Sequence, residues 1–152
     1  IVDVTPSALQ RHAEMSADDR GTVAFAQGDR TFPDFESLLA VTAVAAPHRD
    51  LESLRRGLFH NTRRLPDGSW TWRYDTIRSV GDFTELWTDV SAITAPTTLI
   101  RGGDSFFVTA DDVAEYTQRS PGLTTHVVDG AGHSVQSDRP RVLVELLRMT
   151  LA

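Results

Sequence analysis

One histidine of this sequence lies in a setting suited to acid–base catalysis. His133 belongs to the glycine-rich segment Gly130-Ala131-Gly132-His133-Ser134, between an apolar run and the last helical pattern of the chain. An imidazole changes its protonation near neutral pH, and neighbouring glycines let the backbone approach a reacting group closely. We therefore expect His133 to act as a general base in acyl transfer, with a nucleophile at one ring nitrogen and an acid at the other. The alternative is a turn histidine that only caps the following helix.

The part of the chain that must position this loop follows an α/β pattern. Residues 97–100 form an apolar run typical of a buried strand, which ends at Gly102-Gly103, where the chain can turn sharply. A helix should follow, because Thr109 is a favourable N-cap and two aspartates lie behind it in the first turn, near the positive end of the helix dipole. The Pro-Gly sequence at 121–122 predicts the end of that helix.

A second strand is predicted over residues 123–128, followed by the glycine-rich loop at 129–137 and a closing helix over 139–149. The apolar face of that helix would carry Val142, Leu146 and Met149. Two parallel strands joined by a helix form a crossover, and ligands of such sheets bind at the carboxyl ends of the strands. We therefore expect the loops at 102–107 and 130–134 to open on the same edge of the sheet.

The stretch before these elements has a different pattern. It is mostly helix-like and is interrupted by glycines and prolines. A turn is predicted at Pro66-Asp67-Gly68, and the alternation of aromatic and polar residues over 70–74 favours a short strand or an extended segment. We expect this stretch to be an inserted, largely helical region.

Composition argues against several classes of partner and site. All 15 basic residues are arginine, against 21 acidic residues, and the net charge of -6 makes nucleic acid a poor partner. The 152 residues include no cysteine, which excludes disulfides and Cys-ligated metal sites and fits a cytoplasmic location. No apolar stretch reaches the roughly 18 residues of a membrane span, so no membrane partner is expected. The other histidines lack metal-ligand spacing, so no metal is expected.

Residues 97–152 resemble the C-terminal end of the α/β-hydrolases. The segment 96–105, Pro-Thr-Thr-Leu-Ile-Arg-Gly-Gly-Asp-Ser, is similar to the penultimate strand and acid-bearing loop of that family. The segment 128–134, Val-Asp-Gly-Ala-Gly-His-Ser, is similar to its last strand and histidine loop. Residues 54–58 and 67–75 resemble the cap of one branch of the family, and the matches occur in the family's order.

This resemblance implies an α/β fold, namely the C-terminal part of a mostly parallel α/β-hydrolase sheet flanked by helices, with an inserted helical cap. Residues 1–5 would end a strand of the hydrolase core, residues 6–91 would form the helical cap region, and residues 92–152 would form the C-terminal βαβα part of the core. The implied activity is hydrolysis of a small, largely apolar, ester-like substrate by a nucleophile, His133 and an acid. Such a reaction needs no cofactor.

The acid departs from the common family pattern. Many members have Gly-x-x-Asp after the penultimate strand, and the position that matches this Asp, counted from Gly102, is Ser105. A serine hydroxyl cannot supply the negative charge that stabilises an imidazolium. The candidates are Asp104 next to it and Asp3, which resembles the acid that some members carry at the end of the strand before the cap. We favour Asp3, because an aspartate one residue off in a tight turn would usually point elsewhere; a capping or turn role stays open for both.

The nucleophile expected from the family has no match in this sequence. It should lie in a Gly-x-Ser-x-Gly elbow upstream of the acid and the histidine, and neither Ser105 nor Ser134 has that setting. The chain, which opens on Ile1, is therefore expected to be a fragment, a piece of a split enzyme, or a sequence without its N-terminal half. That half of the hydrolase, in the same or a separate chain, would supply the nucleophile and the oxyanion hole. A Ser nucleophile would serve ester, lactone or carbon–carbon bond hydrolysis, and an Asp epoxide or haloalkane hydrolysis.

Aromatic residues could line the apolar substrate pocket that caps of this family provide. The candidates are Phe25, Phe59, Trp70, Trp72 and Phe106. Those within residues 6–91 could equally form the cap's own core. The alternative to an enzyme is a non-catalytic hydrolase-like fragment or subunit, whose open sheet edge pairs with another chain.

Overall fold

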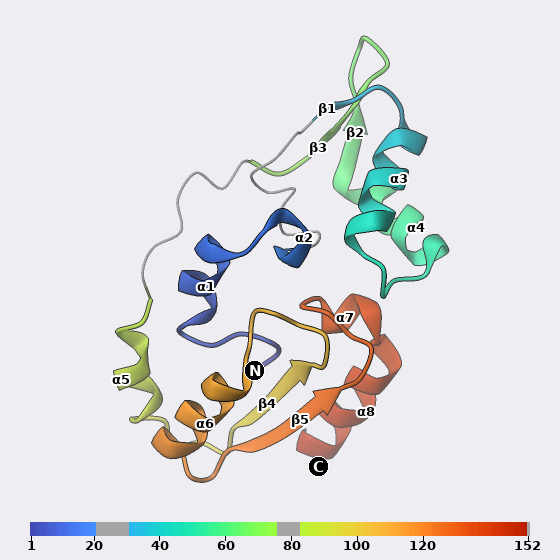
Figure 1. Cartoon of the computed structure of the whole chain (residues 1–152). Helices are drawn as coiled ribbons and strands as arrows, with labels where there is room; N and C mark the ends of the chain where they lie inside the picture. The colour runs from blue at the N-terminus through green and yellow to red at the C-terminus, as the bar shows by residue number, and fades with distance from the viewer. Residues whose placement is uncertain (21–30, 76–82, 152) are drawn as a thin grey trace. The chain divides into compact units, whose positions relative to one another are not determined.

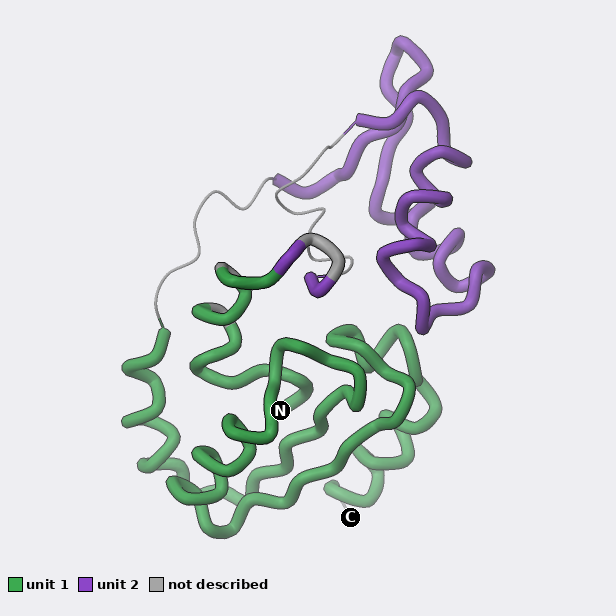
Figure 2. The backbone as a smooth tube through the Cα atoms, viewed as in Figure 1, with its two compact units in different colours: residues 1–15, 81–152 green, residues 16–80 purple. Residues whose placement is uncertain are grey.

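The chain divides into two compact units in a computed structural model (Figures 1 and 2). Residues 1–15 and 81–152 form the first, which we call the terminal unit, and residues 16–80 form the second, the inserted unit. The inserted unit is a continuous stretch of sequence, whereas the terminal unit is built from both ends of the chain. The structure describes three ranges of residues, 1–20, 31–75 and 83–151.

The terminal unit is built on a parallel pair of strands, β4 (Thr98–Gly102) and β5 (Thr124–Val128). Their register pairs the last residue of β4 with the last residue of β5, so both strands end at the same edge of the sheet. Helix α6 (Ala110–Arg119) connects them, and Val2 forms a further parallel bridge to Ile100 of β4. The predicted order of strand, helix and strand, and the common edge for both loops, are confirmed.

The start of α6 is fixed by a capping box whose N-cap the sequence predicted. The Thr109 side chain accepts a hydrogen bond from the backbone N–H of Asp112, and the Asp112 carboxylate accepts one from the N–H of Thr109. Tyr116 on the buried face of the helix packs against Trp87 of α5 (Leu86–Val90), and burial raises the pKa of its phenol. The helix ends ahead of the predicted Pro-Gly stop.

The core of the terminal unit joins the two strands to the last two helices. β5 is followed by α7 (Val135–Asp138), which makes the loop shorter than the predicted 129–137. A short helix of this kind carries too little periodicity to be recognised in sequence. The buried residues that pack together are Ile100, Val128, Ala131, Val135 and Leu143.

The closing helix α8 (Pro140–Leu151) exists as predicted, but its predicted buried face is wrong in part. Leu143 is buried and Leu146 packs against the core, whereas Val142 and Met149 are exposed. The rotation of a helix about its axis is set by the residues it meets, which apolar periodicity alone does not specify. Neither α8 nor any other helix in the described residues is long and apolar enough to cross a bilayer.

A helix from the start of the predicted cap region belongs to the terminal unit. α1 (Ala8–Glu14) lies there together with α5, so the inserted unit is shorter at each end than the predicted region 6–91. The physical reason is long-range pairing: the Arg11 guanidinium of α1 donates to both carboxylate oxygens of Asp112 in α6.

The inserted unit combines helices with a three-stranded antiparallel sheet in the order β1-β3-β2. The predicted turn is present, with Gly68 in the left-handed region at φ +91°, and the predicted extended segment is β3. Its pairing with the other two strands was not predicted, because both are very short. The elements of the unit are α2 (Ala17–Arg20), β1 (Thr31–Phe32), α3 (Phe35–Ala45), α4 (Leu51–Asn61), β2 (Thr62–Arg64) and β3 (Trp70–Trp72).

Helices α3 and α4 each begin at an aspartate. The Asp34 carboxylate accepts a hydrogen bond from the backbone N–H of Ser37, and Asp50 does the same with Ser53. These hydrogen bonds hold the pKa of both carboxyls below the usual range. Buried residues from the helices and the sheet form one core, composed of Phe32, Leu38, Leu39, Ala46, Leu54, Leu58 and Trp72.

Candidate active site

The loops that follow β4 and β5 lie side by side at the carboxyl edge of the sheet (Figure 1) and are hydrogen bonded to each other. The backbone N–H of Gly103 donates to the carbonyl of Val128 at 2.9 Å, and that of Asp104 donates to the carbonyl of Ala131 at 3.0 Å. A Cβ on Gly102 would lie 2.3 Å from the carbonyl oxygen of Gly132. Glycine is therefore required at 102 for the two loops to approach this closely.

His133 is hydrogen bonded to Asp3. The Nδ1 atom of the imidazole lies 2.9 Å from Oδ2 of Asp3, across 130 residues of sequence. The Asp3 carboxylate is fully buried, while 33% of the His133 side chain is exposed. When Nδ1 carries the proton and donates it to Asp3, Nε2 is left as an acceptor for another group. This is the arrangement that a histidine general base requires.

Backbone pairing brings Asp3 to this position. The N–H of Asp3 donates to the carbonyl of Ile100, and the N–H of Ile100 donates to the carbonyl of Ile1. Asp3 itself has φ +45°, a left-handed conformation that Asp adopts more readily than most residues. Its Oδ1 atom accepts a hydrogen bond from the N–H of Gly102 at 2.9 Å. Residues 1–3 therefore run alongside β4, and the Asp3 carboxylate is held at the end of that strand.

Asp104, the other candidate acid, lies in a different environment. Its side chain is exposed, and its backbone N–H is one of the two described above that link the loops. Of the two candidates, the buried Asp3 is the one whose carboxylate is hydrogen bonded to the imidazole.

Ser105 and Phe107 belong to the site although the sequence did not identify them. The Ser105 hydroxyl donates to Oδ2 of Asp3 at 2.5 Å and accepts from the N–H of Phe107 at 3.1 Å. The Phe107 ring is stacked on the His133 imidazole, with 3.9 Å between centroids and 22° between planes. No sequence pattern predicts this role for Ser105, and none distinguishes Phe107 from its neighbour Phe106.

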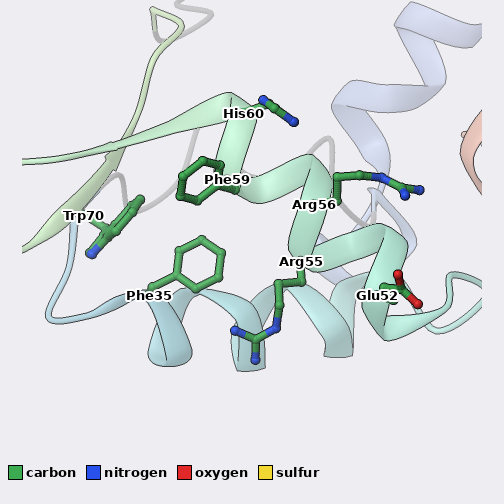
Figure 3. A pocket seen from close by; sticks show the side chains of 7 residues that line it. All are labelled: Phe35, Glu52, Arg55, Arg56, Phe59, His60 and Trp70. Carbon is green, nitrogen blue, oxygen red and sulfur yellow. The ribbon is translucent and has the colours of Figure 1, made fainter.

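The predicted substrate-binding residues lie in different places. Phe106 is 59% exposed in the terminal unit, and Trp72 is buried in the core of the inserted unit, in line with the alternative that the sequence left open. Phe59 and Trp70 line a hollow of about 510 Å³ in the inserted unit (Figure 3). Phe25 falls outside the described residues.

The hollow is lined by aromatic rings and charged groups. The Phe35 ring lies edge-on to Trp70 with 4.9 Å between centroids, and Phe59 is 6.5 Å from Trp70. A bidentate hydrogen bond from Arg55 holds the pKa of the Glu36 carboxyl below its usual range. The other lining residues are Glu52, Arg56 and His60.

In the described part of the chain, no group of three His, Asp or Glu side chains is placed to hold a metal ion. The described site therefore offers acid–base chemistry by a partly exposed imidazole, His133, that is hydrogen bonded to a buried carboxylate, Asp3.

Comparison with known proteins identifies the family of this chain. A sequence model of the alpha/beta hydrolase family matches residues 4–146. The chain belongs to this family. The predicted fold class is thereby confirmed, together with the resemblance on which it was based.

The esterase Rv0045c of Mycobacterium tuberculosis is 59% identical to this chain over 152 residues. The match covers 99% of this chain and 51% of that protein, so the chain spans about half the length of the curated relative. A solved structure of the same M. tuberculosis esterase superposes with a TM-score of 0.81 at 58% identity, covering 99% of this chain and 53% of that one.

A solved structure of much lower sequence identity has the same fold. The crystal structure of E-2-(acetamidomethylene)succinate hydrolase has a TM-score of 0.70 at 18% identity and covers 97% of this chain and 53% of that chain.

Proposed function

We propose that the protein containing this chain is an esterase in which His133 is the general base and Asp3 is its acid. The observation that carries the proposal is the hydrogen bond between Nδ1 of His133 and the buried carboxylate of Asp3. The identity of 59% to a mycobacterial esterase supports ester hydrolysis as the reaction. Asp104, which is exposed, has no catalytic part in this proposal.

In the proposed reaction, His133 accepts the proton of a nucleophile on Nε2. The nucleophile is a serine in the part of the enzyme outside residues 1–152, which also supplies the oxyanion hole. Asp3 keeps the proton on Nδ1 before attack and stabilises the imidazolium that forms during it. The imidazolium then protonates the leaving alcohol, and a water molecule completes the cycle by hydrolysing the acyl-enzyme with His133 again as the base.

The substrate in this proposal is a small, largely apolar ester. The aromatic lining of the hollow in the inserted unit supports a substrate-binding role for Phe59 and Trp70. A cytoplasmic location is part of the proposal, because a chain without cysteine fits a reducing compartment.

The test uses the full-length protein with p-nitrophenyl butyrate as substrate. We expect His133→Ala to lower kcat by at least about 10,000-fold, because it removes the base, and Asp3→Asn by about 10,000-fold, since an amide cannot hold the required tautomer or stabilise the imidazolium. Asp104→Asn is the matched control, because it makes the same chemical change two residues beyond β4 and should leave kcat within about twofold. Thermal unfolding of each variant separates loss of catalysis from loss of fold.

The outcomes discriminate between the candidate assignments. Undiminished turnover by His133→Ala would contradict the role of the histidine, and a large loss in Asp104→Asn instead of Asp3→Asn would reverse the choice of acid. Labelling with an organophosphate should modify a serine outside residues 1–152. Failure to label, together with hydrolysis of an epoxide or haloalkane, would indicate an Asp nucleophile, and a wild-type protein inactive on all of these substrates would favour the non-catalytic alternative.

A further inference from the structure

We propose that Ser105 is a positioning residue for the His133 imidazole. It acts on the edge of the ring through Asp3 and on the face of the ring through Phe107. The proposal rests on the catalytic role of His133 and Asp3 proposed above. Ser105 occupies the position at which many family members carry the acid. In this chain the acid proposed above is Asp3, and the Ser105 hydroxyl donates a hydrogen bond to it.

The hydrogen bonds of the Ser105 hydroxyl leave it a single orientation. A hydroxyl has one proton to donate, and here that proton is directed at Oδ2 of Asp3. Its lone pairs accept from the backbone N–H of Phe107. The side chain is buried, so any rotation away from these partners would leave a buried polar group without a hydrogen bond. The hydroxyl is thus a rigid link between a carboxylate and a backbone segment.

The first contact controls the edge of the imidazole. Oδ2 of Asp3 lies within hydrogen-bond distance of both the Ser105 hydroxyl and Nδ1 of His133, while Oδ1 accepts from the N–H of Gly102. Donors on both oxygens fix the plane of the carboxylate. Without Ser105, Oδ1 would still be held by the N–H of Gly102, but Oδ2 would be restrained only by Nδ1 of His133, the group that it has to position. The carboxylate and the imidazole could then shift together about the Asp3 Cβ–Cγ bond. The direction of the Asp3–His133 hydrogen bond, and with it the direction of Nε2, would then be less well defined.

The second contact controls the face of the imidazole. By accepting from the N–H of Phe107, the Ser105 hydroxyl closes a tight turn over residues 105–107. This turn carries the Phe107 ring that is stacked on His133 at 3.9 Å. The Arg11 guanidinium binds the carbonyl of the same residue at 2.7 Å, which holds the turn from its other side. Stacking on Phe107 limits rotation of the imidazole about its Cβ–Cγ bond, which the hydrogen bond to Asp3 alone would not prevent.

The experiment compares Ser105→Ala, Ser105→Thr and Ser7→Ala in the full-length protein, with p-nitrophenyl butyrate as substrate. We expect Ser105→Ala to lower kcat by about 10- to 100-fold with KM within about twofold, because misdirection of a catalytic group by a fraction of an ångström acts on the chemical step. Ser105→Thr retains the hydroxyl and should recover kcat to within about threefold of the wild type. Ser7→Ala removes a serine hydroxyl that accepts a hydrogen bond from Trp87 Nε1 in the same unit, and it should leave kcat unchanged.

The results separate a positioning role from a purely structural one. An unchanged kcat in Ser105→Ala would overturn the proposal, and so would equal losses in the Ala and Thr variants, since the hydroxyl would then not be the cause. Where alanine prevents folding, Ser105→Cys keeps the size of the side chain with only a weak donor, and the proposal requires kcat to fall while KM holds. Failure of the proposed function looks different, because His133→Ala would then hydrolyse the ester as well as the wild type.

Discussion

Two sets of buried polar side chains, one in each unit of this protein, are hydrogen bonded in different ways. In the inserted unit, the hydroxyls of Thr42 and Thr62 are buried, and each donates to the carbonyl four residues earlier, Leu38 and Leu58. In the terminal unit, the buried carboxylate of Asp3 is hydrogen bonded to side chains more than 100 residues away. The buried groups of the first kind are neutral and local, and those of the second are charged and distant in sequence.

The difference follows from what each group requires. A hydroxyl needs one acceptor, and a helix offers carbonyls within its own turn. A buried carboxylate needs several donors or a cation, because the cost of removing a charge from water is high. Asp112 shows the same rule, since Arg11 binds both of its oxygens from 101 residues away. The candidate chemistry is therefore found where segments from both ends of the chain meet, and the predictions below test that dependence.

The largest effect on stability is expected from Gly102→Ala. The new Cβ would meet the carbonyl oxygens of Gly132 at 2.3 Å and Ala131 at 2.7 Å, both backbone atoms that cannot move without displacing His133. We expect a loss of about 3 kcal/mol in the free energy of unfolding, with a fall in kcat of at least about tenfold where the variant folds. Urea denaturation and ester hydrolysis measure the two effects. A stable, fully active Gly102→Ala would show that the contact between the loops is looser than the structure indicates.

A smaller effect is expected from Arg11→Ala in the terminal unit. This change leaves the buried Asp112 carboxylate without its cation and removes a donor to the carbonyl of Phe107. The guanidinium is partly exposed, so we expect a loss of about 2 kcal/mol, less than for a fully buried pair. The matched control is Arg55→Ala in the inserted unit, which removes an equally well-aligned but exposed pair with Glu36 and should not shift the denaturation midpoint measurably. Equal shifts in both variants would remove the distinction between the units.

The smallest effect, of opposite sign, is expected from Gly57→Ala. Gly57 lies within α4 of the inserted unit, and a Cβ there would meet nothing within 4 Å. Alanine has the higher helix propensity, so we expect a gain of about 0.5 to 1 kcal/mol in the free energy of unfolding. The thermal midpoint of the full-length protein measures it, with Gly102→Ala as the contrasting glycine substitution. A destabilised Gly57→Ala would mean that this face of α4 is covered in the full-length protein.

Much of the local structure could be predicted because local forces produce it. Thr109 marks the start of α6 through hydrogen bonds within three residues, and the Pro66-Asp67-Gly68 turn needs only a residue that tolerates positive φ. The strands β4 and β5 and the helices α6 and α8 follow from apolar periodicity in the same way, whereas α7 is too short to show it. The errors arose where a neighbour decides the outcome. The buried face of α8 contains Leu143 in place of Val142 because the core contacts that side of the helix.

The sequence by itself determined where the candidate site lies, since a glycine-flanked histidine after a strand is expected at the carboxyl edge of a parallel sheet. It narrowed the candidate acid to Asp3 or Asp104 and favoured Asp3, but it contained no evidence of a contact between either carboxylate and His133. Tertiary structure decided which carboxylate contacts His133, because that depends on the bridge from Val2 to β4 and on the left-handed backbone at Asp3. It also determined that Ser105 and Phe107 meet at the imidazole. These contacts join residues that the sequence keeps far apart, and no short-range pattern records them.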